Sequence, residues 1–413
     1  MHYVVTDAKK RLNFLYMAAW SVLLVVTLLE GLSGLGRTAA FSPFLNDLCR
    51  DLSLSRTQIS AAYALAHLAT MFVLPSIGRL FDRASFSKFL SIFTILFGIS
   101  FVGMSGLRIF DTMSWVSLFI LWLGTFGIRT ALHSYSIAGR STIALWFSKE
   151  RGVAMGIYTL FTTLIGSAVP SIAYHLHQHF AWATVWVSIG LLWSVMLLLC
   201  PFAVKPPSKN EPTVSSPLPS EQKTTYRPIL FYFVMTTLFF KAFQNTGITL
   251  HWMPMCHEFG ADAEKVSFGF MPIAVVSITT TFIFGHFFKK ITPATVLLLF
   301  LSADLGMLCA AKAIAATVGV YGFILFTGLY YGLNNVVATL VLPVLFGVKK
   351  IGALHGWAYA FVSFGSSVGS FYFGWMSDRA SYQAALSICM VAVFVLILCL
   401  FWLRKSLRRH ETV

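Results

Sequence analysis

Long apolar segments follow one another from near the start of this chain to its end, with short polar segments between them. Each is about 18 to 25 residues long, which is enough to cross a bilayer as a helix. The first follows Lys9, Lys10 and Arg11 but has no small-residue cleavage site, so we interpret it as a retained helix rather than a signal peptide. The pattern predicts an all-α membrane protein with twelve spans, near residues 14–39, 57–79, 86–107, 114–138, 151–175, 181–203, 228–252, 265–287, 293–312, 316–342, 350–375 and 382–403.

The composition agrees with this interpretation. The 413 residues are 57% hydrophobic and only 11% charged, whereas a soluble chain of this length needs far more polar surface to cover its core. The six cysteines are scattered without metal-ligand spacing, and most lie in apolar segments, which favours buried small side chains over a metal site. There is no glycine-rich phosphate loop, nucleophile elbow or HExxH motif, so we expect neither an enzyme nor a cofactor.

The net charge of +15 predicts topology rather than a nucleic-acid partner. Lys and Arg concentrate in every second polar segment, and that side of a membrane protein is normally cytoplasmic. With an even number of spans, both termini are then expected in the cytoplasm, and the protein in the cytoplasmic (inner) membrane. The opposite side receives few basic residues, namely Arg50, Arg56, Arg108, Lys265, Lys312 and Arg379.

The chain also divides into two similar halves. Segment 204–227 is rich in Pro, Ser, Lys and Thr and is interpreted as a flexible cytoplasmic linker between a bundle over 1–203 and a bundle over 228–413. "WFSKERGVAMG" (146–156) and "LFGVKKIGALHG" (345–356) repeat a basic turn followed by two glycines four residues apart, a spacing that permits close helix contact. An internal repeat of this kind is typical of two fused six-helix units.

One short motif links the chain to a known family. "GRLFDR" (78–83) resembles the cytoplasmic signature of the major facilitator superfamily, and the resemblance implies two pseudo-symmetric six-helix bundles around a central cavity. It also implies secondary transport by alternating access, gated in part by Asp82 and Arg83. The match is incomplete, because "ASFSK" replaces the downstream part of the signature. The second-half counterpart "GHFFKK" (285–290) has no aspartate.

Three further stretches resemble the branch of monocarboxylate porters and oxalate/formate antiporters: "FSPFLNDLCRDLSLSRTQIS" (41–60), "ALWFSKERGVAMGI" (144–157) and "GSFYFGWMSDRASYQAAL" (369–386). The eighth span lacks the acid and arginine common in monocarboxylate porters. The eleventh lacks the lysine expected of oxalate/formate antiporters. We therefore do not transfer the substrates of these two families to this chain. A polycarboxylate or a carboxylate siderophore fits its dispersed basic residues as well as a small monocarboxylate does.

Polar residues inside the spans predict the transport site, because an ionisable group in a bilayer should face a partner or a water-filled cavity. Three cations against one clear carboxylate favour an organic anion, and arginine suits carboxylates. We expect Arg37, Arg129 and Lys241 to bind it, while Tyr331, Asn334, Gln244 and Asn245 orient it. His133 either contacts the anion or supports Arg129. The polar residues lie on spans one, four, seven and ten, which line the cavity in the resembled fold: Glu30 and Arg37; Arg129, His133, Ser134 and Tyr135; Lys241, Gln244 and Asn245; Tyr330, Tyr331, Asn334 and Asn335.

Three charged residues in the spans have further interpretations. Glu30 is either neutralised by Arg37 or Arg129, or it couples transport to protons, since a carboxyl group in low dielectric takes up a proton more readily. Arg37 could also snorkel to the interface. Asp304, in the ninth span, is interpreted as a packing residue, with Lys312 as its partner.

Two other functions compete with anion transport. One is export or import of a larger amphipathic compound, such as a siderophore or drug, although the positive charge argues against cationic drugs. The other is a non-transporting receptor on the same scaffold. In every case the expected partners are a small molecule and the lipid bilayer, with protons if transport is coupled, and the protein is expected to be a monomer.

Overall fold

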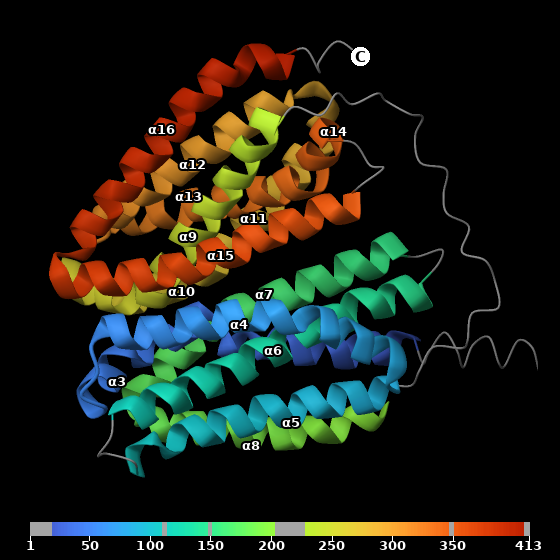
Figure 1. Cartoon of the computed structure of the whole chain (residues 1–413), viewed down its shortest axis with the longest axis vertical. Helices are drawn as coiled ribbons and strands as arrows, with labels where there is room; N and C mark the ends of the chain where they lie inside the picture. The colour runs from blue at the N-terminus through green and yellow to red at the C-terminus, as the bar shows by residue number, and fades with distance from the viewer. Residues whose placement is uncertain (1–18, 110–113, 148–150, 203–227, 347–350, 409–413) are drawn as a thin grey trace, which may run out of the picture. The chain divides into compact units, whose positions relative to one another are not determined.

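A computed structural model describes residues 19–109, 114–147, 151–202, 228–346 and 351–408 (Figure 1). Within these ranges the chain is helical and has no strand, so the predicted all-α class is confirmed. Ten helices in the described ranges are long and apolar enough to cross a membrane. Two more long helices, α9 (Pro228–Phe259) and α15 (Ile351–Arg379), lie where the seventh and eleventh spans are predicted. The structure is therefore consistent with twelve spans.

The chain forms two compact units, the first of Met1–Ala40 and Ala69–Pro212, the second of Phe41–Leu68 and Thr213–Val413. Residues 41–68, which the sequence analysis assigns to the N-terminal bundle, thus pack with the C-terminal half. The predicted linker at 204–227 lies outside the described residues, as do residues 148–150 and 347–350 of the two repeats. The domain limits stay predictions.

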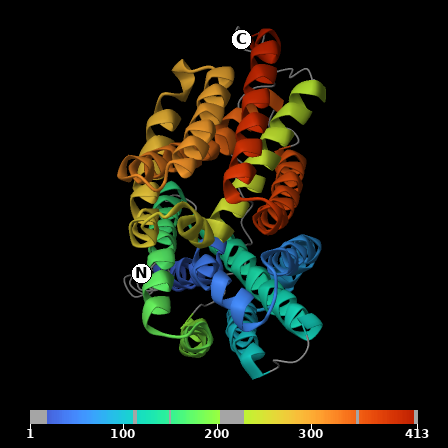
Figure 2. The ribbon, with the colours of Figure 1, turned by 90° about the vertical axis from the view of Figure 1, so that its left-hand side faces the viewer.

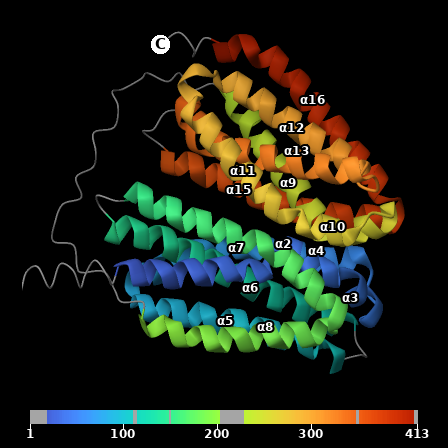
Figure 3. The ribbon, with the colours of Figure 1, turned by 180° about the vertical axis from the view of Figure 1, so that it is seen from behind.

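The first unit begins with the span Ala19–Gly36, which ends in the 3₁₀ turn η1 (Ser33–Gly36). It continues with α5 (Phe86–Ser105), η3 (Gly106–Ile109), α6 (Ser114–Trp146), α7 (Arg151–His179), α8 (Trp182–Met196) and η4 (Leu197–Phe202). Helices α5 and α8 lie side by side (Figure 3). Between them the rings of Phe97 and Trp193 stack with centroids 4.2 Å apart, and Trp193 Nε1 donates to the Tyr135 hydroxyl at 3.0 Å. Large buried rings with satisfied polar ends hold this core together.

The second unit contains α9, α10 (Ala263–Phe268), α11 (Phe270–His286), η5 (Phe288–Lys290), α12 (Pro293–Lys312), α13 (Thr317–Val336), the π-turn η6 (Val337–Val341), α14 (Leu342–Phe346), α15 and α16 (Tyr382–Arg408). Helices α9 and α15 make the most extensive helix pair (Figure 2). Gly365 and Gly369, four residues apart on α15, face the carbonyls of Phe239 and Phe243 so closely that a Cβ at either position would collide with that backbone. Small residues allow this approach of two helices in lipid.

The start of the second transmembrane helix also belongs to the second unit. Residues 41–68 comprise η2 (Ser42–Phe44), α3 (Leu45–Asp51) and the first part of α4 (Arg56–Arg83); the short α2 (Thr38–Phe41) precedes them. Ser42 Oγ accepts from the backbone N–H of Met253 at 3.0 Å, and Ser60 Oγ lies 3.1 Å from His251 Nε2. Gly374 of α15 leaves room for the Ser60 side chain, which a Cβ there would overlap. These contacts attach 41–68 to α9 and α15.

Candidate functional site

The first unit brings Glu30 and Arg37 together, as their seven-residue spacing suggests. Glu30 is buried, with 8% of its surface exposed, and accepts a hydrogen bond from the Tyr158 hydroxyl of α7. Arg37 and Arg140 are the cations whose fields act on Glu30. The Tyr158 ring reaches this position because Gly139 of α6 has no side chain where the phenol passes. A tyrosine and two arginines therefore surround this carboxylate.

The position of Arg37 follows from a break in the first helix. After η1 the backbone becomes extended at Arg37, with φ −77° and ψ 156°. The guanidinium then lies against α7, where Nη1 is 2.8 Å from the point at which Gly166 would carry a Cβ. Gly34 packs beside it on Gly166 and Val169. The half-buried Arg37 is thus fixed against α7, and its role in a binding site stays a prediction.

Arg129 and His133 lie one turn apart on α6, so they share a face of that helix. Arg129 is buried, with 6% of its surface exposed, and His133 is half-buried. Tyr135 points elsewhere, into the α5–α8 core, where its hydroxyl donates to Thr94 Oγ1 at 3.2 Å. Of the polar residues predicted on this span, Tyr135 therefore serves packing.

In the second unit Lys241 has a carboxylate neighbour that the sequence analysis assigns elsewhere. Asp304 of α12 is buried, with 2% of its surface exposed, and Lys241 of α9 is the cation whose field acts on it. With the Gln244 amide oriented so that its nitrogen faces this carboxylate, the orientation that satisfies both groups, it donates to Asp304 Oδ1 at 2.6 Å and to Oδ2 at 3.2 Å. The expected Asp304 partner, Lys312, donates instead to Ser387 Oγ at 2.8 Å. The predicted pairing of Asp304 with Lys312 is therefore wrong. The sequence feature that could have indicated a role for Asp304 was its position as a lone acid in an apolar span.

The other predicted residues of this unit form a polar strip between α9 and α13. The Tyr331 hydroxyl donates to Asn245 Oδ1, and the Tyr330 hydroxyl donates to the Lys241 carbonyl at 2.9 Å. Asn334 is half-buried one turn beyond Tyr330. Gln244 differs from these residues, because its side chain is fully buried and engaged by Asp304.

The predicted gating residues lie at the end of α4. Asp82 and Arg83 are the last two residues of that helix, and both side chains are exposed. In the second half, α11 ends at His286, and Lys290 lies over the Phe287 ring at 5.8 Å from its centroid. The turn after α4 and its counterpart after α11 thus differ in local structure as well as in sequence.

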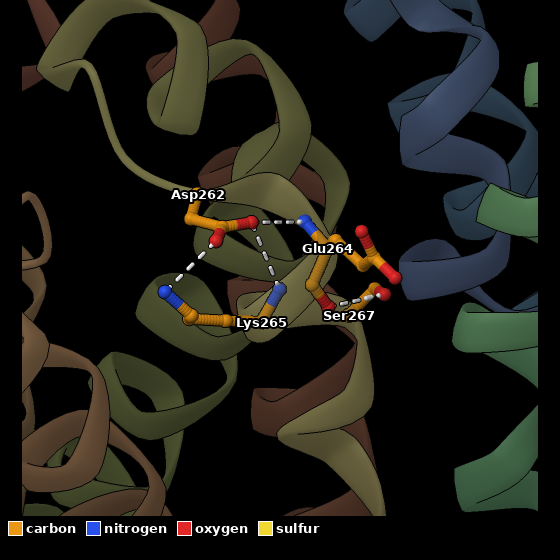
Figure 4. A network of polar contacts seen from close by, with 4 residues as sticks. All are labelled: Asp262, Glu264, Lys265 and Ser267. Carbon is orange, nitrogen blue, oxygen red and sulfur yellow. Dashed lines mark hydrogen bonds and ion pairs between the residues drawn. The ribbon is translucent and has the colours of Figure 1, made fainter.

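The connection from α9 to α10 is fixed by a helix cap outside the spans (Figure 4). Asp262 Oδ1 accepts from the backbone N–H groups of Glu264 at 3.1 Å and Lys265 at 3.2 Å, while Oδ2 lies 3.1 Å from Lys265 Nζ. The hydrogen bond from the Lys265 backbone N–H is the main reason that the pKa of Asp262 is lowered from its ordinary value. This carboxylate is exposed and stabilises a helix start rather than forming part of a binding site.

An apolar groove of about 310 Å³ lies between α5 and α8, lined among others by Gly98, Gly103 and Gly190. It contains none of the predicted site residues. Each unit therefore contains its own polar cluster of predicted residues: Glu30, Arg37, Arg129 and His133 in the first unit, and Lys241, Gln244, Asn245, Tyr331 and Asn334 in the second.

Long apolar helices with buried charged groups on several of them define the class of protein: an integral membrane transport protein. The sequence matches the Major Facilitator Superfamily profile over residues 26–369. The chain belongs to this superfamily and is a transporter, not an enzyme.

Solved structures show the same fold. A bacterial homologue of the human lysosomal transporter Spinster, in its inward-facing and unoccupied conformation, aligns with a TM-score of 0.71 and 16% identity, over 95% of this chain and 98% of the other. The inward-facing and occupied form of the same homologue aligns with a TM-score of 0.68 and 16% identity, over 94% of this chain and 97% of the other. A mutant of the nucleoside transporter NupG aligns with a TM-score of 0.70 and 13% identity, over 92% of this chain and 99% of the other. No curated protein sequence matches the chain.

Proposed function

We propose that this protein is a secondary active transporter that moves a small organic anion, one bearing a carboxylate, across the cytoplasmic membrane by alternating access. The observation that supports this most is the buried Arg129 guanidinium on a membrane helix of a transporter fold. Burial of an arginine in a membrane helix costs several kcal/mol, roughly 3 on insertion scales, so such residues usually serve a substrate pathway. Its planar fork of donors matches a carboxylate.

The charges in the polar clusters of the two units agree with an anionic substrate. Arg37 has Glu30 beside it and Lys241 has Asp304, while Arg129 adds a third cation. With Arg140, whose field also acts on Glu30, four cations accompany two carboxylates over the two units, and this excess of positive charge supports an anionic substrate. Asn245, Tyr331 and Asn334 supply neutral groups of the kind that orient a polar ligand.

Topology and gating are part of the proposal. The distribution of Lys and Arg supports cytoplasmic termini, and the exposed Asp82 and Arg83 are proposed to brace the cytoplasmic turn after α4. Within the superfamily we place the chain nearest the monocarboxylate porters and oxalate/formate antiporters on its three sequence patches, and we propose that it works as a monomer. For Glu30, the contact with Tyr158 and the nearby arginines support the pairing role over proton coupling.

The test is counterflow in proteoliposomes that contain the purified protein. Labelled lactate, succinate and citrate are compared with choline as a cation and glucose as a neutral solute. We expect counterflow of at least one of the three anions, abolished by Arg129→Ala and partly kept by Arg129→Lys.

Arg50→Ala is the matched control, because the Arg50 side chain is 71% exposed on α3. It should transport like the wild type. A preference for choline or glucose that survives Arg129→Ala would refute the proposal.

A further inference from the structure

Asp304 is an unusual acid for a membrane protein, since it is buried on α12 and no part of the proposed anion site uses it. Burial of a carboxyl group favours its neutral form unless a cation or several donors hold the charge. In the part of the chain that the structure describes, the amide of Gln244 is its hydrogen-bond donor. One cation, Lys241, acts on it.

On the neighbouring helices, the described groups that interact electrostatically with Asp304 carry no positive charge. Helix α12 packs against α13 and α16. From α13 the phenol of Tyr330 interacts with the Asp304 charge, and from α16 the thiol of Cys389 does so. Both groups are neutral when protonated. Among the residues that the structure describes, Lys241 is therefore the cation that compensates an ionised Asp304.

The surroundings of Glu30 differ in this respect. Glu30 accepts a hydrogen bond from Tyr158, and the positive charges of Arg37 and Arg140 both act on it. An arginine stays charged in proteins, so it holds a neighbouring carboxylate ionised, whereas a lysine can adjust its charge state and partner more readily. Of the two buried acids, Asp304 is thus the one better suited to gain and lose a proton.

We propose that Asp304 is the proton-binding residue that couples transport to a pH gradient, and that Lys241 links its protonation to anion binding. With Asp304 ionised, the Lys241 ammonium is compensated by that carboxylate. When a proton from the aqueous phase binds Asp304, the ammonium loses its internal partner and can pair with the carboxylate of the substrate.

One proton and one monoanion then enter the site together, and the site gains no net charge. Release on the other side reverses both steps, with the proton returned to water and Lys241 paired again with Asp304. The half-buried Lys241 is placed for this exchange, because the Asp304 charge acts on it and it precedes Asn245, the hydrogen-bond partner of Tyr331, by one turn of α9. This inference rests on the proposed anion transport.

The test compares two assays on the same proteoliposomes, using whichever of lactate, succinate and citrate gives the highest counterflow. The first is counterflow at equal pH, which requires binding and alternating access but no net proton movement. The second is accumulation driven by an imposed pH gradient, for which one pH unit supports about tenfold accumulation of a monoanion moved with one proton.

We expect Asp304→Asn to keep counterflow but to lose accumulation above equilibrium. Asp262→Asn, on the exposed cap of α10, is the matched control and should behave as the wild type in both assays. Full accumulation by Asp304→Asn overturns the inference, and so does a folded Asp304→Asn that has lost counterflow, because Asp304 would then be needed for binding itself. If the wild type shows no counterflow of any anion, it is the proposed function that fails.

A second measurement covers the case in which Asp304→Asn does not fold. Addition of the same anion to wild-type protein in weakly buffered detergent solution should cause proton uptake, followed with a pH-indicator dye. The double variant Lys241→Gln/Asp304→Asn leaves no lone buried charge and should show none. Binding to the wild type without proton uptake overturns the inference.

Discussion

Thr57 and Asp378 are joined by two hydrogen bonds although they lie 321 positions apart in the chain: the Thr57 backbone N–H and hydroxyl donate to Asp378 Oδ2 at 2.8 and 2.7 Å. Thr57 is in the first turn of α4, where backbone N–H groups have no partner within the helix. A carboxylate from the end of α15 thus caps α4 from another part of the second unit. Capping and the helix dipole both favour an anion there.

The first prediction concerns this cap. Asp378→Ala should lower the stability of the second unit by about 1 kcal/mol, as the loss of a helix cap usually does at an exposed site. The change is measured by thermal unfolding of the purified protein in detergent. Asp378→Asn keeps an acceptor oxygen, so it should lower the stability by less than Asp378→Ala does. Equal losses in the two variants would show that charge, rather than the hydrogen bonds, stabilises the contact.

A second prediction concerns His251, which is fully buried on α9 between two hydroxyl groups. Its Nε2 lies 3.1 Å from Ser60 Oγ and its Nδ1 lies 2.8 Å from the Tyr382 hydroxyl. His251→Phe should destabilise the protein by about 2 to 6 kcal/mol, because two buried hydroxyls would each lose a partner at about 1 to 3 kcal/mol. The measurement is the free energy of unfolding, where it is reversible, or the melting temperature.

Tyr382→Phe provides the matched comparison for His251. It removes one hydroxyl and one of the two hydrogen bonds, so it should cost less than His251→Phe. In the double variant the second change should add little to the first, since the two residues share one contact. Additive losses would contradict the pairing.

The sequence predicts the helices well but not the contacts between them. Each span is an apolar run with its own local signal, and Glu30 and Arg37 share a helix face by spacing alone. Asp304 meets Lys241 and Gln244 only because α12 and α9 pack with a particular rotation, which side-chain packing decides. The attachment of residues 41–68 to the second unit depends on pairs such as Thr57 and Asp378. The sequence around either residue does not predict such a long-range pair.

A third prediction tests the close approach of α9 and α15. Gly369→Ala should destabilise the protein by roughly 1 to 3 kcal/mol, because the new methyl group would overlap the Phe243 carbonyl and force two packed helices apart. The melting temperature of the purified variant gives the result.

Gly103→Ala is the control for Gly369. Gly103 also lies within a helix, α5, but among the residues that the structure describes nothing is within 4 Å of a Cβ built there. Alanine has the higher helix propensity by about 1 kcal/mol, so this change should be neutral or stabilising. A Gly369→Ala protein as stable as the wild type would mean that α9 and α15 separate at little cost.

The last prediction is a pH dependence at the α10 cap. The pKa of Asp262 is lowered, chiefly by the hydrogen bond from the Lys265 backbone N–H and then by the Lys265 side chain. A carboxyl group whose pKa is lower in the folded state stabilises that state above the unfolded-state pKa, and this contribution disappears as the pH falls through the folded-state pKa. Asp262→Ala should therefore melt below the wild type at neutral pH, and the gap should close as the pH falls below the ordinary aspartate pKa of about 3.9.

Asp262→Asn separates the charge of this cap from its hydrogen bonds. Asparagine keeps an acceptor for the Glu264 and Lys265 N–H groups but cannot ionise, so its melting temperature should lie between those of the wild type and Asp262→Ala at neutral pH. The difference between Asp262→Asn and Asp262→Ala should not change with pH, because neither side chain titrates at this position. If the gap between the wild type and Asp262→Ala stays constant down to the lowest pH, the ionised carboxylate does not stabilise the start of α10.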